Sequence, residues 1–197
     1  MPRKHQGTDV TVARVLDAAL RVHAEHGREG FTMTAVIDAT GLSSGSLYHH
    51  FGSFDGLAAA LCARCLADLL DALLDALTGI TEARAGVEAV ARAYLAFTRE
   101  HSDAARFIHA SAHAAFLPEH ADVVAELKAP RIARLVEWMV PHIKAGEVAP
   151  LSPATMEMLL IGPVAETARR WLSCDPAIDL DEAADVLPSR IWRSLQP

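Results

Sequence analysis

Apolar residues recur at the spacing of an amphipathic helix along most of the chain. The first stripe has members three and four residues apart, namely Val12, Val15, Leu16, Ala19, Leu20 and His23. Thr8 or Asp9 can cap its start, and Gly27 is a stop signal at its end. The pattern predicts a helix over about residues 12–26, preceded by a flexible arm over 1–9, where no periodicity is found.

A second, shorter helix is predicted between Thr32 and Gly41. Thr32 is a residue type that favours the N-cap position, and Gly41 is a stop signal. Between them Met33, Val36 and Ile37 share one face. This segment is long enough for only about two helical turns.

A third helix is predicted after Ser43, which is another favourable N-cap residue. Leu47 and Phe51 lie one turn apart on one face, so their burial leaves Gly45 and His49 pointing away. A short helix, a glycine turn and a second short helix form the plan of a helix-turn-helix.

The rest of the chain also has helical periodicity and no strand pattern, so the fold class predicted is all-α. Ser53 can cap a long helix over about 54–77, closed by Gly79. Further helical patterns cover about 81–101, 103–116, 119–143, 153–173 and 180–195. Four prolines fall inside or near the ends of these patterns, where they should kink or end a helix: Pro130, Pro141, Pro163 and Pro188.

Composition narrows the class of protein. The chain has 197 residues, 51% of them hydrophobic, and only three cysteines, so it can bury a core and does not read as a disulfide framework. It lacks the apolar segment of a signal peptide or a membrane span. We therefore expect a cytoplasmic protein. The net charge of −7 disfavours nucleic-acid binding only if the charge is spread evenly, since local distribution decides.

The segment from Phe31 to Leu57 carries the strongest motif. Its sharpest part reads Gly41-Leu42-Ser43, then Gly45-Ser46-Leu47-Tyr48, then His50-Phe51 and Ser53. This segment closely resembles the DNA-binding signature of TetR-family (TetR/AcrR-type) transcriptional regulators. The motif covers roughly residues 10–60, and beyond it only the lengths and order of the helices match the family.

The resemblance implies a set of DNA-binding residues. Thr32 resembles the position that caps the second helix beside a phosphate, and Thr34 a position that can reach a base. The groove-facing side and phosphate-contacting end of the recognition helix would be Ser44, Gly45, Ser46, Tyr48, His49 and His50. The chemistry is compatible, because hydroxyls and helix N-terminal amides donate to phosphate oxygens and a tyrosine ring can pack on a thymine methyl.

The resemblance also implies an architecture and a function. Residues 10–52 would be the helix-turn-helix DNA-binding domain, and 53–197 a ligand-binding and dimerisation domain. The protein would be a repressor that binds a pseudo-palindromic operator as a homodimer and responds to a small, mostly apolar effector. Dimerisation would use about 153–173 and 180–195, where Gly162, Ala165 and Ala168 permit close packing and Trp171 and Trp192 add apolar area. No cofactor is implied.

Two departures from the family pattern leave a second function open. Phe54 stands where the family commonly has a lysine, and no Lys or Arg lies between Arg28 and Arg64. Residues 10–60 hold three basic side chains, Arg14, Arg21 and Arg28, against five acidic ones, Asp17, Glu25, Glu29, Asp38 and Asp55. Electrostatic attraction to DNA would then rest on Arg3, Lys4, backbone amides and protonated histidines. The alternative is a helical protein-interaction adaptor whose degenerate helix-turn-helix no longer binds DNA.

Other chemistry has weak signals. Cys62 and Cys65 have the spacing of a metal or redox pair, but without a second pair they favour buried thiols. His109 and His113 lie four residues apart, yet the glutamate of a zinc-protease motif is missing, so no metal is expected. The chain has no nucleophile elbow, P-loop or dinucleotide fingerprint, which disfavours an enzyme.

Large side chains at helical spacing form stripes in the second half of the chain, and most such stripes are plain core. In the TetR family the core of the second domain is hollow, so a subset should line an effector cavity. Bends at Pro130 and Pro163 would open space for it, and histidines would supply polar anchors, which suits an acid or phenol. The predicted wall consists of Phe97, His101, Phe107, His113, Trp138, Met156 and Leu160.

Overall fold

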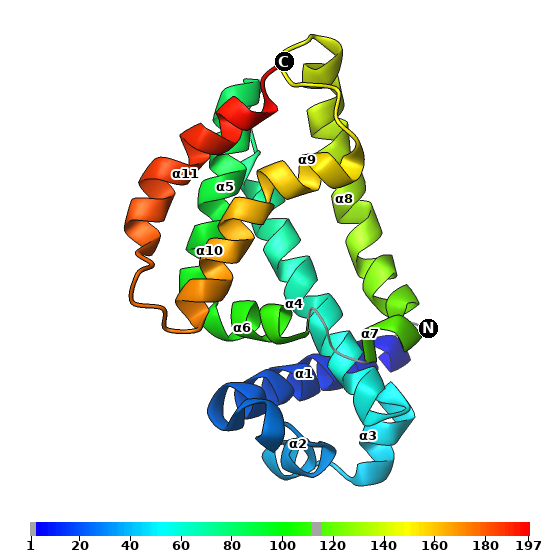
Figure 1. Cartoon of the computed structure of the whole chain (residues 1–197). Coiled ribbons are helices and arrows are strands. Elements are labelled where there is room, and N and C mark those ends of the chain that lie inside the picture. Colours follow the sequence, from blue (N-terminus) through cyan, green and yellow to red (C-terminus); the bar gives the residue numbers. More distant parts are fainter. Residues whose placement is uncertain (1–2, 112–115) are drawn as a thin grey trace. The chain divides into compact units, whose positions relative to one another are not determined.

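The computed structural model describes residues 3–111 and 116–197 and is all-helical over these ranges (Figure 1). Its helices are α1 (Arg3–Gly30), α2 (Met33–Thr40), α3 (Ser44–Phe51), α4 (Phe54–Ala76), α5 (Ala83–Glu100), α6 (Ser102–Ser111), α7 (Phe116–Glu119), α8 (Ala121–Lys144), α9 (Pro153–Leu160), α10 (Gly162–Leu172) and α11 (Leu180–Leu195). The described ranges contain no strand, which confirms the predicted fold class.

The first helix is longer than the sequence pattern indicated. It begins at Arg3, so the expected flexible arm over 1–9 is helical from that residue onward. Once a helix has nucleated, each added residue costs little free energy, and an apolar face is not needed at its end. Gly27 leaves helical geometry with φ 64° and ψ −167°, and helical structure resumes to Gly30. The predicted stop is therefore a kink.

The prolines act differently from one another. Pro130 and Pro141 lie inside α8, which continues through both. Pro188 likewise lies inside α11 and is buried. In contrast, the single helix predicted over about 153–173 is divided at Ile161, because Pro163 has no N–H to donate to the carbonyl four residues earlier. Pro163 therefore occupies the first turn of α10, where no intrahelical N–H is required.

The chain forms two compact units, each built from separate segments. Unit 1 comprises residues 1–65 and 107–127. Its core is made by one face each of α1, α2, α3 and the first part of α4, and its fully buried members include Val15, Ala19, Val36, Leu47, Leu57 and Leu61. The predicted apolar stripes of the first three helices therefore supply this core.

Unit 2 comprises residues 66–106 and 128–197. Helix α5 lies at its centre, packed against α10 and α11. Buried side chains from the three helices include Val87, Ala91, Leu95, Val164, Ala168, Ile191 and Leu195. Arg106 closes the end of α10 by donating from Nη1 to the Leu172 carbonyl at 2.7 Å.

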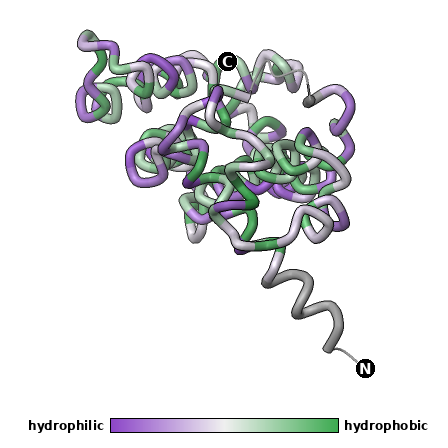
Figure 2. Tube along the Cα trace, turned by 90° about the horizontal axis from the view of Figure 1, so that it is seen from below, coloured by the Kyte–Doolittle hydropathy of each residue, from purple (hydrophilic) through white to green (hydrophobic). Residues whose placement is uncertain are grey.

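Hydrophobic and hydrophilic positions alternate along the Cα trace, as expected for amphipathic helices (Figure 2). Among the helices of the described ranges, none combines the length and hydropathy needed to cross a bilayer.

Candidate nucleic-acid interface

The start of α2 and the turn after it are built by local backbone chemistry. Thr32 is extended (φ −130°) and its hydroxyl oxygen accepts from the Ala35 N–H at 3.2 Å, which confirms it as the N-cap. At the other end Gly41 is left-handed (φ 66°) and donates its N–H to the Ile37 carbonyl at 2.9 Å. Glycine adopts this conformation without steric cost, so it can end α2 and reverse the chain toward α3.

Helix α3 is held by one deeply buried side chain. The Ser43 hydroxyl accepts from the Ser46 N–H at 3.2 Å, which confirms the second predicted cap. Leu47 is completely buried, whereas Phe51 is only partly buried. Tyr48, next to Leu47, keeps 49% of its surface exposed. An aromatic ring of this size left in water, on a helix anchored by its neighbour, is available to a partner.

The predicted DNA-binding residues share one property, access to solvent. Thr32, Thr34, Ser44, Gly45, Tyr48 and His49 are exposed, and Ser46 and His50 are partly exposed. Six of these eight residues come from the single helix α3, and the other two from the cap and first turn of α2. Their part in DNA binding stays a prediction.

The junction between α3 and α4 is tight. Gly52 is left-handed (φ 73°), and a Cβ added to Gly56 would lie 2.1 Å from the Phe51 carbonyl oxygen, so α4 approaches the end of α3 closely. The Ser53 hydroxyl accepts from the Gly56 N–H at 2.9 Å, as expected of the residue that caps α4. Phe54 packs its ring 5.0 Å from that of Phe31. The residue that replaces the family's lysine therefore contributes to packing.

Charged groups in unit 1 are sparse near α3. Asp17 of α1 accepts from Arg64 Nη1 of α4 at 2.7 Å, which neutralises one of the five acidic side chains between residues 10 and 60. His49 and His50 follow the exposed face, with ring centroids 5.5 Å apart. Arg14 and Arg21 are both exposed on α1, the helix that precedes the helix-turn-helix.

The residues predicted to line an effector cavity do not all come from one unit. Phe107 belongs to unit 1, where its ring packs 4.8 Å from His23 and 5.6 Å from Phe31. In unit 2, Phe97 is buried with its ring 4.9 Å from the exposed His101. The Trp138 ring lies 4.5 Å from that of His142 with the two planes tilted by 50°, and Met156 and Leu160 of α9 are partly exposed. His113 lies outside the described residues, and the cavity stays a prediction.

Two of the predicted dimer residues are partly exposed, as a contact surface requires. Trp171 and Trp192 are only partly covered by the rest of the chain. Ala168 differs from the expectation, because it is fully buried inside unit 2 and cannot contact a partner. It faces inward because α10 packs that side against α5 and α11. Gly162 and Ala165 remain accessible on α10.

Of the two possible metal pairs, only Cys62 and Cys65 lie wholly within the described residues. Cys62 and Cys65 are both buried in α4, as thiols with a structural role usually are. Across the described ranges no three His, Cys, Asp or Glu side chains gather in a way that could hold a metal ion.

Comparisons with known proteins agree on the kind of domain that α1–α4 form. The family model for bacterial regulatory proteins of the tetR family matches residues 15–61. The HTH-type transcriptional repressor AcnR of Corynebacterium glutamicum is 36% identical over 73 residues, which is 37% of this chain and 38% of AcnR. The chain therefore matches less than half the length of this curated relative.

Solved structures extend the likeness to the whole fold. A TetR family transcription regulator from Marinobacter aquaeolei VT8 is 21% identical, with a TM-score of 0.76 over 97% of this chain and 98% of that one. The transcriptional regulator FadR from Bacillus subtilis, solved in complex with stearoyl-CoA, is 16% identical, with a TM-score of 0.76 over 93% and 99%. Residues 15–61 therefore form a domain similar to the DNA-binding domain of tetR-family regulators, and the solved structures show the fold of the rest of the chain.

Proposed function

We propose that this protein is a transcriptional repressor that binds a pseudo-palindromic operator as a homodimer. The observation that carries the proposal is the surface of α3, where Tyr48, Ser44 and His49 are exposed around the completely buried Leu47. Hydroxyls, imidazoles and a phenol ring on a rigid helix can contact base edges and phosphates in a major groove. A two-fold dimer presents two such helices, so the operator is a pseudo-palindrome.

The two functions are divided along the chain in this proposal. Residues 10–52 read DNA, and residues 53–197 bind the effector and form the dimer through α9, α10 and α11, which cover about 153–173 and 180–195. Support for the dimer comes from the partly exposed Trp171 and Trp192 and from Val186, which keeps 45% of its surface exposed on α11. Apolar area of this kind is costly to leave in water and is commonly covered in an oligomer.

The effector in this proposal is a small, mostly apolar molecule bound in the region of α4 to α10. The Bacillus subtilis FadR, which shares the fold, was solved with stearoyl-CoA, an acyl chain on a polar carrier. Release from DNA follows if the effector binds better to a conformation in which the two copies of α3 are wrongly spaced for the operator. Helix α4 can transmit the change, because it begins next to α3 and runs from unit 1 into unit 2.

A mobility-shift titration on DNA flanking the protein's own gene tests the repressor proposal. Tyr48→Ala should weaken binding by about tenfold or more, because removing a side chain that reads a base edge costs ~1–3 kcal/mol. Val136→Ala, which trims an exposed large apolar side chain of α8 outside the proposed DNA-binding and dimer segments, serves as the matched control and should bind like wild type. Thermal denaturation should show both variants folded.

The outcomes separate this proposal from the adaptor alternative. Absence of a shift with the wild-type protein, even at low salt where phosphate contacts are strongest, would favour the adaptor. Light scattering should report a dimer at micromolar concentration, and a monomer would contradict the two-fold arrangement. Stearoyl-CoA and stearic acid, added to the protein–DNA complex, test whether an acyl chain releases the operator.

A further inference from the structure

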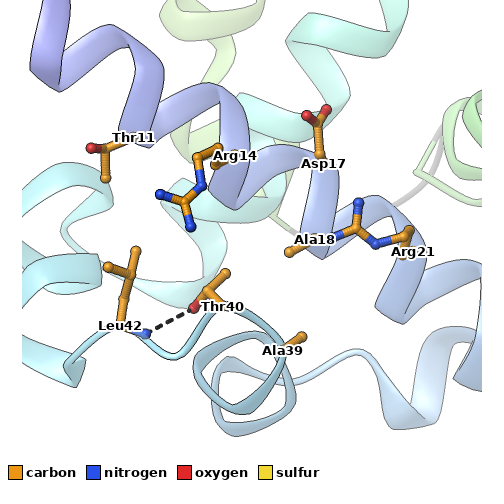
Figure 3. Close-up of a pocket in the computed structure, with 8 residues that line it drawn as sticks. All are labelled: Thr11, Arg14, Asp17, Ala18, Arg21, Ala39, Thr40 and Leu42. Atoms are coloured by element: carbon orange, nitrogen blue, oxygen red, sulfur yellow. Dashed lines mark hydrogen bonds between the residues drawn. The ribbon is translucent and has the colours of Figure 1, made fainter.

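A polar pocket of about 170 Å³ lies in unit 1, beside the turn that leads into α3. One wall is α1, and the other is the end of α2 with the residues after it (Figure 3). Its lining consists of Thr11, Arg14, Asp17, Ala18, Arg21, Ala39, Thr40 and Leu42. The pocket therefore adjoins the proposed DNA-reading surface without including any of the residues predicted to form it.

Two of the lining residues are arginines on the same face of α1. Arg14 and Arg21 are seven residues apart, which is about two helical turns, so their side chains emerge on one side of the helix. Figure 3 shows the guanidinium of Arg14 extending toward Thr40 and Leu42. Both arginines are exposed, and among the ion pairs of the described residues neither takes part in one.

The acidic residue of the pocket is already neutralised. Asp17 points away from Thr40 and Leu42, and its carboxylate accepts from Arg64 Nη1 at 2.7 Å. Asp17 lies between Arg14 and Arg21 in the sequence, and an unpaired carboxylate there would offset their positive charge. Its ion pair with Arg64 removes this effect. The net character of the pocket is therefore cationic, although the chain as a whole carries a charge of −7.

The opposite wall is rigid. The Thr40 hydroxyl donates to the Val36 carbonyl at 2.8 Å, and its oxygen accepts from the Leu42 N–H at 3.4 Å. These bonds fix the end of α2 against the left-handed Gly41. A ligand held by the arginines would thus be positioned against a fixed surface at the entry to α3.

We infer that Arg14 and Arg21 form a binding site for a phosphate group. A guanidinium presents planar N–H donors that match phosphate oxygens, and its charge persists at every pH a protein tolerates. The inference rests on the proposed function in one respect: the phosphate would belong to the operator backbone. No Lys or Arg lies between residues 28 and 64, so the helix-turn-helix itself provides little electrostatic attraction to DNA. Arg14 and Arg21 would provide that attraction.

The salt dependence of operator binding tests the site. Log Kobs should fall less steeply with log salt for Arg14→Ala and Arg21→Ala, by about 0.9 for each phosphate that the variant no longer neutralises and so by about 1.8 in a dimer. Affinity at fixed salt should drop about tenfold for each variant. Arg14→Lys should keep the slope while losing part of the affinity, because lysine retains the charge without the two-pronged geometry.

Arg28→Ala is the matched control. It removes one positive charge from the same helix, at an exposed position outside the pocket. Its slope should stay that of wild type. Equal slopes for the Arg14, Arg21 and Arg28 variants would overturn a DNA phosphate as the ligand.

A second measurement without DNA identifies the source of the phosphate. Inorganic phosphate, titrated at constant ionic strength, should raise the melting temperature of wild type and not that of the Arg14→Ala/Arg21→Ala double variant. If phosphate raised the melting temperature only when both arginines were present, while the salt slopes of operator binding stayed unchanged, the ligand of the pocket would be free phosphate. No stabilisation and no change in slope would overturn the site. If wild type bound no DNA at all, the repressor proposal would fail. The phosphate titration would still show whether the pocket binds phosphate.

Discussion

Helices α5 and α8 show how differently two long helices of one chain can be used. Helix α5 has 18 residues, and nine of them are buried, including Val90, Tyr94 and Leu95. Helix α8 has 24 residues, all of them described, and none is buried. Yet α8 is apolar enough to look like a core helix, and Val136 keeps 52% of its surface exposed. Apolar residues at helical spacing therefore identify a helix, but not the depth at which it lies.

The part of α8 in unit 2 is held by a small number of specific contacts instead of a broad apolar interface. Arg131 donates from Nε and Nη2 to the two carboxylate oxygens of Asp71 on α4, at 2.8 and 2.7 Å. Trp138 donates from its indole nitrogen to the Ile80 carbonyl at 3.0 Å. A helix attached in this way can move at a lower free-energy cost than α5, since the movement exposes little buried apolar area.

Truncating one apolar side chain in each setting should give the largest contrast. Leu95→Ala removes a side chain that is 2% exposed in α5 and should lower the free energy of unfolding by about 3 kcal/mol. Val136→Ala in α8 should change it by less than about 0.5 kcal/mol. Urea denaturation followed by circular dichroism measures both. Comparable losses would mean that α8 is covered in solution.

Gly86→Ala probes a place where Trp138 of α8 lies close to the backbone of α5. An added Cβ would lie 2.1 Å from the ring of Trp138, so the indole must move and its bond to the Ile80 carbonyl should break. We expect a loss of about 2 kcal/mol, typical of overpacking. The emission of Trp138 should shift to longer wavelength, measured in a variant with Trp171 and Trp192 replaced by Phe. Unchanged emission would show that the packing here is loose.

The pH dependence of stability tests how deeply Tyr94 of α5 is buried. Burial raises the pKa of its phenol from 10.0 to about 12 in the folded protein. Folding favours the neutral phenol. Its contribution to the free energy of unfolding is therefore complete below pH 10 and is lost as the pH rises from about 10 to 12. At pH 11 wild type should have lost about 1 kcal/mol that Tyr94→Phe retains. Parallel pH profiles of unfolding for the two proteins would contradict this.

The Asp71–Arg131 pair should have the smallest effect on global stability. Its side chains are 45% and 23% exposed, so solvent screens the attraction, and we expect Asp71→Asn to cost about 0.5–1 kcal/mol. Arg131 donates the hydrogen bonds that raise its pKa, and it stays charged in the variant because the pKa of an arginine lies far above neutral even without them. Amide exchange should accelerate in α8 and not in α5. Glu88→Gln, which removes the ion pairs of Glu88 with Arg84 and Arg92 within α5, is the control.

The local features of the fold could be predicted from the sequence where one or two residues decide them. Thr32, Ser43 and Ser53 cap their helices as expected, because a hydroxyl beside the first free N–H groups needs no tertiary context. The buried Leu47 and the exposed Tyr48 were likewise predictable, since adjacent helical positions point in different directions.

Features that depend on packing were not predictable in the same way. Gly27 permits a kink as well as a stop, and neighbouring helices decide between them. Ala168 is small enough for an interface between chains or for the core, and the partners of α10 placed it in the core. Arg14 and Arg21 could be seen as two cations on one face, but the pocket beside them required the position of Thr40 and Leu42.

Helix α3 contains eight residues, and among them only Leu47 is buried. The exposed positions can therefore be exchanged with little effect on folding, which separates changes in DNA preference from the maintenance of stability. A new binding preference could be grafted onto this helix by changing Ser44, Gly45, Ser46, Tyr48 and His49 alone. Length is the one property that such redesign must preserve, because one residue inserted after Leu47 would rotate Tyr48 and His49 by about 100° relative to Leu47.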